Sequence, residues 1–452
     1  MSILIENAKA IVTIDRQDRV LRDTNILIEG NIIKKIGPEK YQADTIIDAK
    51  NMFVYPGLIN THHHLYQTFT RNLPQVQKME LFNWLTTLYE IWRELNPDVI
   101  YYSSLIGMAD LLKNGCTTVF DHHYVFPKIN NKIFIDQQFS AAKLLGVRFH
   151  ASRGSMSLGK NDGGLPPDDL VQTTEEILKD SERLIDKYHD ANFNSMKQIV
   201  LAPCSPFSIT SDLLKESAKL ARHKDVRLHT HLAETIDEEN FCIEKFGMRP
   251  LAYMESVDWI GNDVWYAHGI HFNDEELKLL ASTGTGIAHC PISNMKLSSG
   301  VAEISKMLEL GVPVGLAVDG SASNDGSNLL EEIRVCYLLH RLKYSHLAPT
   351  AYSILKIATK GGAKILGRND IGSIEEGKPA DLFMINIDNI DCVGAKLDPQ
   401  SILGTVGIKR PVDYTIINGK IVVKNGKLYG IDEERLAYEA NKVFDDFIKN
   451  SI

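Results

Sequence analysis

Three consecutive histidines, His62 to His64, stand in "PGLINTHHHLYQ" (residues 56–67), where an apolar run passes into a loop. Side chains two residues apart on an extended strand point to the same side, so His62 and His64 can act together while His63 faces away. Imidazole is the commonest side-chain ligand for metal ions. The triplet therefore indicates either a metal site or a chance cluster, and the rest of the sequence has to decide between them.

Further polar residues stand at the ends of apolar, strand-like segments. His231 ends "VRLHTH", His268 ends "VWYAH", Asp319 ends "PVGLAVD", and Glu234 follows His231 by three residues. A single strand-end histidine is more often buried and hydrogen-bonded than metal-bound. Several polar residues at the ends of neighbouring strands favour one shared metal site. Three or four imidazoles and one carboxylate suit Zn²⁺ or Fe²⁺ at an open site that keeps a position for water.

Eight short strand-like segments alternate with longer helical patterns through the middle of the chain, which is the rhythm of a parallel α/β fold. They are residues 57–62, 117–122, 147–152, 198–203, 226–231, 264–268, 286–290 and 313–319. In the helical pattern that follows the third segment, Thr173 and Glu176 have the spacing of a capping box. We predict a (β/α)8 TIM barrel over residues 56–371, with an open doubly wound sheet as the alternative. The carboxyl ends of barrel strands share one face, where the polar residues would meet.

Both ends of the chain are rich in short β-type runs and turns. Gly30 separates two apolar runs, and Asn418-Gly419 and Asn425-Gly426 are strong turn signals. We predict that residues 1–55 and 372–452 together form one small β-sandwich domain with a C-terminal helix, and that the barrel is inserted between them. The acidic runs at 237–240 and 432–449 predict solvated helix faces.

The composition is that of an ordinary globular protein, with 44% hydrophobic and 24% charged residues. A formal net charge of -9 argues against nucleic acid as a partner and favours a small neutral substrate. No signal-peptide pattern and no run of about 18 apolar residues is present, so we expect a cytoplasmic protein without a membrane partner. The six cysteines are scattered without a C-x-x-C pair, so we expect reduced thiols. A homo-oligomer is one alternative that the sequence leaves open.

Several segments together resemble a known family over essentially the whole chain. They are "PGLINTHHH", "HTHLAET", "YAHG", "AHCPISNMKL", "VGLAVDGSASND" and "GSIEEGKPADLFMIN". They are similar to the amidohydrolase superfamily, in its deaminase and chlorohydrolase branch. "NTHHHLYQTFTRN", "RGSMSLGKNDGGLPPDD", "LAPCSPFS" and "DGSASNDGSN" resemble the 8-oxoguanine deaminase group, although relatives that act on isocytosine, guanine, adenosine derivatives and s-triazines share much of this sequence.

The resemblance implies one divalent metal ion, with Zn²⁺ favoured and Fe²⁺ as the alternative. The positions that match the family's metal-binding set are His62, His64, His231 and Asp319. His268 matches a residue near the bound water, and Glu234 matches the catalytic acid. The bridging lysine of binuclear relatives is missing from the fourth strand segment, "QIVLAPCSPF", which favours a single ion. In the implied reaction, Asp319 accepts the proton of water and Glu234 protonates the substrate ring.

The implied reaction is hydrolytic deamination of an amino-substituted purine or pyrimidine, with 8-oxoguanine to urate plus ammonia favoured. Isocytosine or guanine deamination, and release of chloride or an alkylamine from an s-triazine, are alternatives because the fold does not fix the leaving group. A metal-free scaffold of the same fold is a further alternative, and the complete polar set argues against it.

Four residues are candidates for substrate binding: Gln67, Trp84, Arg153 and Cys204. The amide of Gln67 suits the edge of a purine, although a surface-loop amide is an equal interpretation. Trp84 could stack on a flat ring, although an aromatic residue at helical spacing is more often core. Arg153 and Cys204 follow the third and fourth strands, and Cys204 is interpreted as a neutral pocket wall because no activating partner is evident.

Four other histidines are interpreted as support rather than as ligands. His122 and His123 follow the second strand and His289 closes the seventh, where each can back the site or pack in a loop. His229 faces the same way as His231 but lies one layer deeper, which favours a structural hydrogen bond.

Overall fold

The computed structural model describes residues 2–128 and 131–451, and an eight-stranded parallel sheet lies at its centre. The strands are β8 (Leu58–Asn60), β9 (Cys116–Asp121), β10 (Arg148–Ser155), β11 (Lys197–Pro203), β12 (Arg227–Leu232), β13 (Val264–His268), β14 (Gly286–His289) and β15 (Val314–Leu316). They stand in chain order across the sheet, and each pairs in parallel with the next. The first and last strands also meet, because the Thr61 N–H donates to the Leu316 carbonyl (3.3 Å).

This arrangement is a nearly closed barrel. A doubly wound sheet reverses its strand order at a switch point, whereas this sheet runs in one direction from β8 to β15. The predicted (β/α)8 barrel is therefore confirmed and the open-sheet alternative is wrong. All eight predicted segments contain a strand, but the outer two are shorter than predicted: β8 ends at Asn60 and β15 ends at Leu316.

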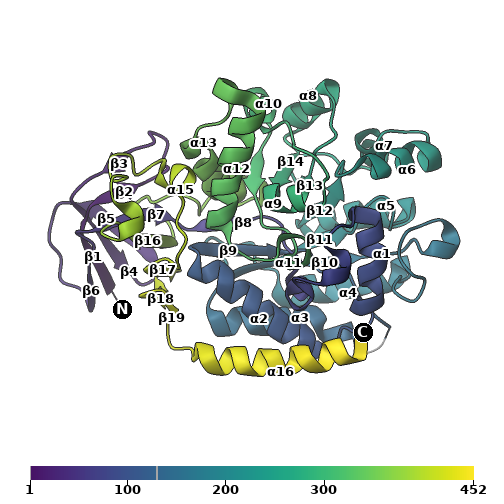
Figure 1. Ribbon diagram of the computed structural model, residues 1–452, viewed down its shortest axis with the longest axis horizontal. Helices are drawn as coiled ribbons and strands as arrows, with labels where there is room; N and C mark the ends of the chain where they lie inside the picture. Colours follow the sequence, from purple (N-terminus) through teal and green to yellow (C-terminus); the bar gives the residue numbers. More distant parts are fainter. Residues whose placement is uncertain (1, 129–130, 452) are drawn as a thin grey trace.

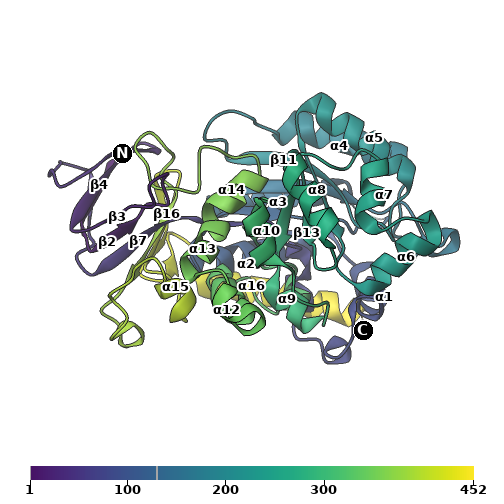
Figure 2. The same ribbon diagram turned by 90° about the horizontal axis from the view of Figure 1, so that it is seen from above.

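Helices cover the outside of the barrel (Figures 1 and 2). They include α2 (Pro97–Lys113), α3 (Phe134–Leu145), α4 (Thr174–Tyr188), α5 (Ser211–Lys224), α6 (Ile236–Phe246), α7 (Pro250–Ser256), α8 (Asp274–Thr283), α9 (Pro291–Lys296), α10 (Ile304–Leu310), α11 (Ser321–Asn324), α12 (Leu329–Tyr344), α13 (Ala351–Lys356) and α14 (Gly362–Ile365). The predicted capping box begins α4: the Glu176 N–H donates to Thr173 Oγ1 (3.3 Å), and the Thr173 N–H donates to Glu176 Oε2 (3.0 Å). Within residues 2–128 and 131–451, no helix is long and apolar enough to cross a bilayer.

Two further helices pack beside the barrel, α1 (Leu81–Trp92) and the C-terminal α16 (Glu433–Ser451). Helix α16 lies along α2 (Figure 1), where Lys113 and Glu433 form an ion pair (2.6 Å) and the Tyr102 hydroxyl donates to Glu439 (3.3 Å). Only Ala440 and Phe447 of this helix are fully buried. The acidic run at 432–449 therefore forms a largely solvated face, as predicted.

Both ends of the chain contribute to two smaller sheets, which lie together on one side of the barrel (Figure 1). One sheet has the order β5-β4-β1-β6 and the other β19-β18-β17-β16-β7-β2-β3. Their strands are β1 (Ser2–Ala8), β2 (Ala10–Val12), β3 (Val20–Leu21), β4 (Thr24–Glu29), β5 (Ile32–Gly37), β6 (Thr45–Asp48), β7 (Met52–Pro56), β16 (Leu382–Asn386), β17 (Tyr414–Ile417), β18 (Lys420–Lys424) and β19 (Lys427–Leu428), with the short helix α15 (Ile402–Thr405) between β16 and β17. Apolar residues of both sheets form one buried cluster, which includes Ile5, Ile28, Val54 and Leu382. The terminal β-rich unit of the predicted fold class is confirmed, and its exact division from the barrel at 55/56 and 371/372 stays a prediction.

A buried ion pair joins the barrel to the C-terminal strands. Arg148, the first residue of β10, donates through Nε to Asp381 Oδ2 (3.0 Å) and through Nη2 to Asp381 Oδ1 (3.2 Å). Asp381 directly precedes β16, and its Oδ1 also accepts the backbone N–H of Asn418 (2.7 Å). Both charged side chains are almost fully buried, so water cannot take the place of one of them if it is lost.

We therefore expect Asp381→Ala to lower the free energy of unfolding by about 3–5 kcal/mol, because it leaves the Arg148 guanidinium buried without its counter-charge. Chemical denaturation followed by circular dichroism measures this change. The matched control is Asp388→Ala in the same segment, where an exposed carboxylate pairs with Lys396, and the expected loss is below about 1 kcal/mol. Equal losses in the two variants would contradict a special role for the buried pair.

Candidate metal and catalytic centre

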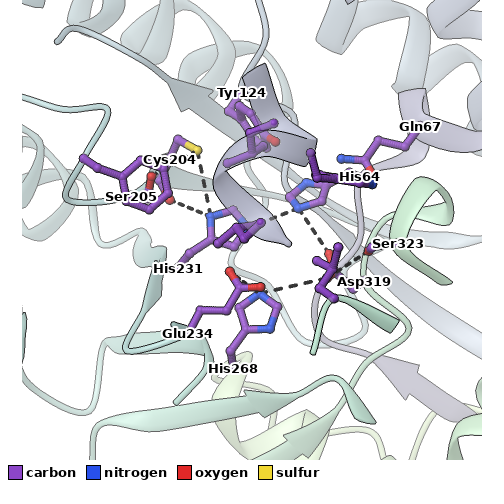
Figure 3. A pocket seen from close by; sticks show the side chains of 15 residues that line it. His64, Gln67, Tyr124, Cys204, Ser205, His231, Glu234, His268, Asp319 and Ser323 are labelled. Atoms are coloured by element: carbon purple, nitrogen blue, oxygen red, sulfur yellow. Dashed lines mark hydrogen bonds and ion pairs between the residues drawn. The ribbon is translucent and has the colours of Figure 1, made fainter. Parts of the chain in front are cut away.

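Five polar side chains gather at the carboxyl ends of the barrel strands (Figure 3 shows four of them). They are His62 and His64 after β8, His231 in β12, His268 at the end of β13 and Asp319 after β15. All five are buried. The rings of His62 and His64 lie 4.7 Å apart, centroid to centroid, whereas His63 leaves the group and contacts Ser327 Oγ through Nε2 (2.9 Å). The alternation predicted for the triplet is therefore present.

Backbone carbonyls fix the protons of two of these rings. His64 Nδ1 lies 2.6 Å from the carbonyl oxygen of His122, and His231 Nδ1 lies 2.6 Å from that of Cys204. A carbonyl only accepts, so each Nδ1 carries the ring proton, and in a neutral imidazole Nε2 then holds a lone pair. The two Nε2 atoms are 3.1 Å apart. Two lone pairs at this distance repel each other unless a cation lies beside them.

The third ring is set by a relay of hydrogen bonds. His229 Nδ1 donates to the Trp265 carbonyl (2.9 Å), so its Nε2 accepts from His62 Nδ1 (2.8 Å). His62 Nε2 is left with a lone pair, is buried, and has no hydrogen-bond partner among the described residues. Burial lowers the pKa of His62 to about 3, so the ring is neutral at physiological pH. The structural hydrogen bond predicted for His229 is confirmed.

Asp319 adds a negative charge to this group of lone pairs. Its Oδ1 lies 3.3 Å from both His62 Nε2 and His64 Nε2. The other oxygen, Oδ2, accepts from Ser293 Oγ (2.6 Å). Three ring nitrogens and one carboxylate oxygen, all acceptors, therefore converge in a buried space. This donor set fits a divalent cation such as Zn²⁺, which usually has four ligands and binds imidazole nitrogens and carboxylate oxygens.

The backbone is strained where it presents these groups. Ala233, His268 and Asp319 all have left-handed φ values, of 53°, 73° and 61°. Such values are uncommon outside glycine and cluster at functional sites. The Asp319 N–H donates to the His62 carbonyl (3.1 Å). This hydrogen bond extends the contact between the first and last strands to the two residues whose side chains lie in the centre. The chain has already left the strand conformation before Asp319, since β15 ends at Leu316.

Glu234 lies beside the cluster as a neutral acid. Its Oε2 is 3.5 Å from His268 Nε2, and the opposite ring nitrogen of His268 lies 2.8 Å from Asn294 Oδ1. Burial and the nearby charge of Asp319 raise the pKa of Glu234 to about 8. A carboxyl group with this pKa keeps its proton at neutral pH and can donate it.

Glu238 is a functional candidate that the sequence reading placed wrongly. The acidic run 237–240 predicted a solvated face, but the Glu238 side chain is fully buried and turned toward the centre. It accepts the N–H of Ala233 on Oε1 (2.8 Å) and that of Glu234 on Oε2 (3.1 Å). Helix α6 begins at Ile236 with Thr235 as its N-cap, so Glu238 is its third residue and faces back over the preceding loop. Glu238 thereby holds the backbone that carries Glu234.

A narrow cavity opens onto the centre. It is lined by His64, Gln67, Leu81, Trp84, Leu85, Tyr124, Cys204, Ser205, Phe207, His231, Glu234, His268, Leu297, Asp319 and Ser323. Three of the four residues predicted to bind substrate are among them: Gln67, Trp84 and Cys204. Burial raises the pKa of the Cys204 thiol to about 12, so this residue is a neutral part of the wall, as expected.

Arg153 is not part of this cavity lining, contrary to expectation. Its guanidinium donates to Asp180 Oδ2 (2.7 Å) and Gln172 Oε1 (2.9 Å) and lies over the ring of Phe126 (3.9 Å). Arg153 therefore points from β10 toward α4 and serves packing, not the cavity. Arg153 was expected just past the third strand, but β10 continues to Ser155 and includes this residue.

Several wall residues were not among the predicted site residues: Leu81, Leu85, Tyr124, Ser205, Phe207, Leu297 and Ser323. Leu81, Leu85 and Tyr124 lie outside the quoted motifs, whereas Ser205, Phe207, Leu297 and Ser323 stand within motifs whose other residues were chosen. The supporting residues Ser293 and Asn294 were also missed, although both stand just after the seventh strand. Position at a strand end was the signal that could have identified them. His122 lies within the cluster, with Nε2 2.8 Å from the Ala202 carbonyl, which fits the predicted supporting role.

A protein-family model, "Amidohydrolase family", matches residues 53–422. The chain belongs to the amidohydrolase family. It is 46% identical to 8-oxoguanine deaminase from Pseudomonas aeruginosa over 410 residues, which are 90% of this chain and 91% of that protein. It is 41% identical to hydroxydechloroatrazine ethylaminohydrolase from Pseudomonas sp. (strain ADP) over 450 residues, 96% of this chain and 93% of that protein. These findings confirm the resemblance in the sequence motifs.

Solved structures of the family have the same fold over nearly the whole chain. Atrazine chlorohydrolase from Arthrobacter aurescens, complexed with zinc, has a TM-score of 0.94 at 35% identity and covers 98% of this chain and 100% of its own. A triazine hydrolase variant has a TM-score of 0.95 at 35% identity, covering 98% and 99%. The barrel and the terminal sheets therefore have close structural counterparts.

We expect Glu238→Gln to loosen the loop that carries Glu234. An amide has one carbonyl oxygen where the carboxylate had two acceptors, so either the Ala233 or the Glu234 N–H loses its partner. Hydrogen exchange of these two amides should become faster, and the free energy of unfolding should fall by about 1–3 kcal/mol.

The matched control is Asp237→Asn, one residue earlier on the exposed side of α6, which should change neither quantity. Unchanged exchange at 233 and 234 in Glu238→Gln would show that the carboxylate does not hold this loop.

Proposed function

We propose that this protein is a metal-dependent aminohydrolase that removes an amino group from a heterocyclic base, with 8-oxoguanine converted to urate and ammonia as the favoured reaction. The observation that carries the proposal is that Glu234, a buried acid whose pKa burial raises to about 8, lines the same cavity as a converging set of acceptor atoms. A hydrolytic deaminase needs both, because water must lose a proton while the substrate ring gains one. The 46% identity to a protein named 8-oxoguanine deaminase supports this choice of base.

The metal would be held by His62, His64, His231 and Asp319. A bound divalent ion supplies hydroxide at neutral pH, because it lowers the pKa of water from 15.7 toward about 7. Zn²⁺ is favoured, with Fe²⁺ as the alternative, because imidazole and carboxylate suit both. Strand β11 ends in Ala202 and Pro203 and carries no lysine near its end, which supports a single ion.

Each remaining residue then has a defined task. Asp319 accepts the proton that water gives up, because its carboxylate lies 3.3 Å from both His62 Nε2 and His64 Nε2, beside the position of the ion. Glu234 delivers a proton to the ring nitrogen next to the carbon under attack, and His268, 3.5 Å from it, can stabilise the oxygen that adds. Asp319 passes the proton that it took from water to the amino group, and the added hydroxyl returns a proton to Glu234 as it becomes the carbonyl. The carbon–nitrogen bond then breaks and ammonia leaves.

The cavity wall supports recognition of an oxopurine. Gln67 Oε1 is a buried acceptor and Trp84 Nε1 a buried donor, and neither has a hydrogen-bond partner among the described residues. An oxopurine edge offers N–H donors and carbonyl acceptors that would satisfy both. Gly320 leaves the space for Gln67, since a Cβ at this position would lie 1.9 Å from Gln67 Oε1.

Release of an alkylamine from a hydroxylated s-triazine is the second candidate. It is supported by the 41% identity to hydroxydechloroatrazine ethylaminohydrolase, which covers 96% of this chain. The same polar centre would serve this reaction, so only the walls separate the two.

We expect the zinc-loaded protein to release ammonia from 8-oxoguanine faster than from guanine, isocytosine, cytosine, adenosine or aminated s-triazines. A coupled ammonia assay compares kcat/KM across this panel, with an N-ethylamino triazine scored by amine release. A preference for the triazine would favour the second candidate. No release from any compound by metal-loaded protein would reject both.

We also expect Glu234→Gln to lower kcat by about 10²–10⁴-fold, because an amide cannot deliver the proton. Metal content, measured by mass spectrometry, should be unchanged. Glu244→Gln, at an exposed position on α6, is the matched control and should keep full activity. An active Glu234→Gln variant would reject the assigned role.

A further inference from the structure

We propose that His289, Cys336 and His340 form a second zinc site, separate from the catalytic centre. The site would lie between the end of β14 and the helix α12 and would serve the fold. It does not depend on the reaction proposed above.

The three side chains come from two elements and meet in the interior. His289 is the last residue of β14, and Cys336 and His340 are one helical turn apart on α12, so both face the strand. All three are fully buried. One potential ligand atom from each lies within 4.8 Å of the others. The cluster shares no residue with the group around Asp319.

Hydrogen bonding alone does not satisfy the two rings. His289 Nε2 and His340 Nε2 are 3.1 Å apart, and both Nδ1 atoms are buried without a partner among the described residues. Burial lowers the pKa of His340 to about 4 and that of His289 well below its usual value, so both rings are neutral. If one Nε2 donates to the other, the accepting ring must carry its proton on Nδ1. The metal-free pair therefore leaves one buried N–H without an acceptor, and Zn²⁺ bound to both Nε2 atoms would place the proton of each ring on its Nδ1.

The spacing matches that of metal ligands. Two nitrogens bound to one Zn²⁺ at tetrahedral angles are about 3.3 Å apart, given Zn–N bonds of about 2.0–2.1 Å. The His289–His340 separation of 3.1 Å is close to this value and equals the Nε2–Nε2 separation of His64 and His231 in the first centre. Two imidazoles and a thiol are the ligand types that zinc selects. Zinc would bind the Cys336 thiolate, and the thiol proton would leave to solvent.

An ion here would stabilise the segment that holds two residues of the catalytic centre. Directly after His289 the chain enters α9, which carries Ser293 and Asn294, the partners of Asp319 and His268. Helix α12 is already tied to this segment at another point, since Glu332 Oε2 accepts the Ile292 N–H (3.2 Å). Zinc between His289 and α12 would add a second tie on the same side.

Cobalt substitution tests the proposal, because only the new site has a thiolate ligand. Protein produced in zinc-depleted, cobalt-supplemented medium should show a thiolate-to-cobalt charge-transfer band in the near ultraviolet. Cys336→Ser and His340→Gln should lose this band. Cys204→Ser is the matched control, since Cys204 is the thiol that lines the first centre, and it should keep the band.

Zinc-loaded wild-type protein should also hold roughly two ions per chain and Cys336→Ser roughly one, with a lower melting temperature. Absence of the band from the wild-type protein, or its loss in Cys204→Ser with retention in Cys336→Ser, would overturn the proposal. The wild-type spectrum alone tests whether a thiolate binds the metal, so the proposal can be rejected even if a variant fails to fold.

Discussion

Closure of the barrel is the constraint on which the centre depends. Strands β8 and β15 come from distant parts of the chain, and they meet where the Asp319 N–H donates to the His62 carbonyl. The side chains of the same two residues then lie 3.3 Å apart. In an open sheet these residues would stand at opposite edges. Closure also brings His231 and His268, from strands across the ring, to the same point, because an eight-stranded barrel is only wide enough for side chains to fill.

The backbone fixes the chemistry of the side chains within this frame. Carbonyls of His122 and Cys204 hold the protons of two imidazoles on the outer nitrogens, and His229 passes the same effect from the Trp265 carbonyl to His62. Lone pairs therefore face inward before any ligand arrives. The Ala233 carbonyl accepts the N–H groups of Ile270 and His271 while its own N–H donates to Glu238, so the loops that carry Glu234 and His268 are held as one unit.

Features that follow from periodicity could be predicted from the sequence. Alternation along a strand separated His63 from its neighbours, and the count of strand-like segments gave the barrel. Glu238 could not be predicted, because acidic residues in a row read as surface, and its burial depends on the left-handed turn at Ala233. Arg153 was expected to follow the third strand, but β10 continues to Ser155, and its partner Asp180 lies on the following helix, a pairing that a single sequence does not show.

The cavity has two parts with different dependence on the fold. Its polar floor is tied to strand ends and backbone carbonyls, so a change there disturbs the barrel. Much of its wall consists of the side chains of Leu81, Trp84 and Leu85 on α1, Phe207 after β11 and Leu297 after α9, none of which supplies one of those ties. Divergence can therefore proceed at unequal rates within one cavity, with the floor inherited almost intact and the walls free to drift. A lineage built in this way can acquire new ligands while its polar floor stays the same.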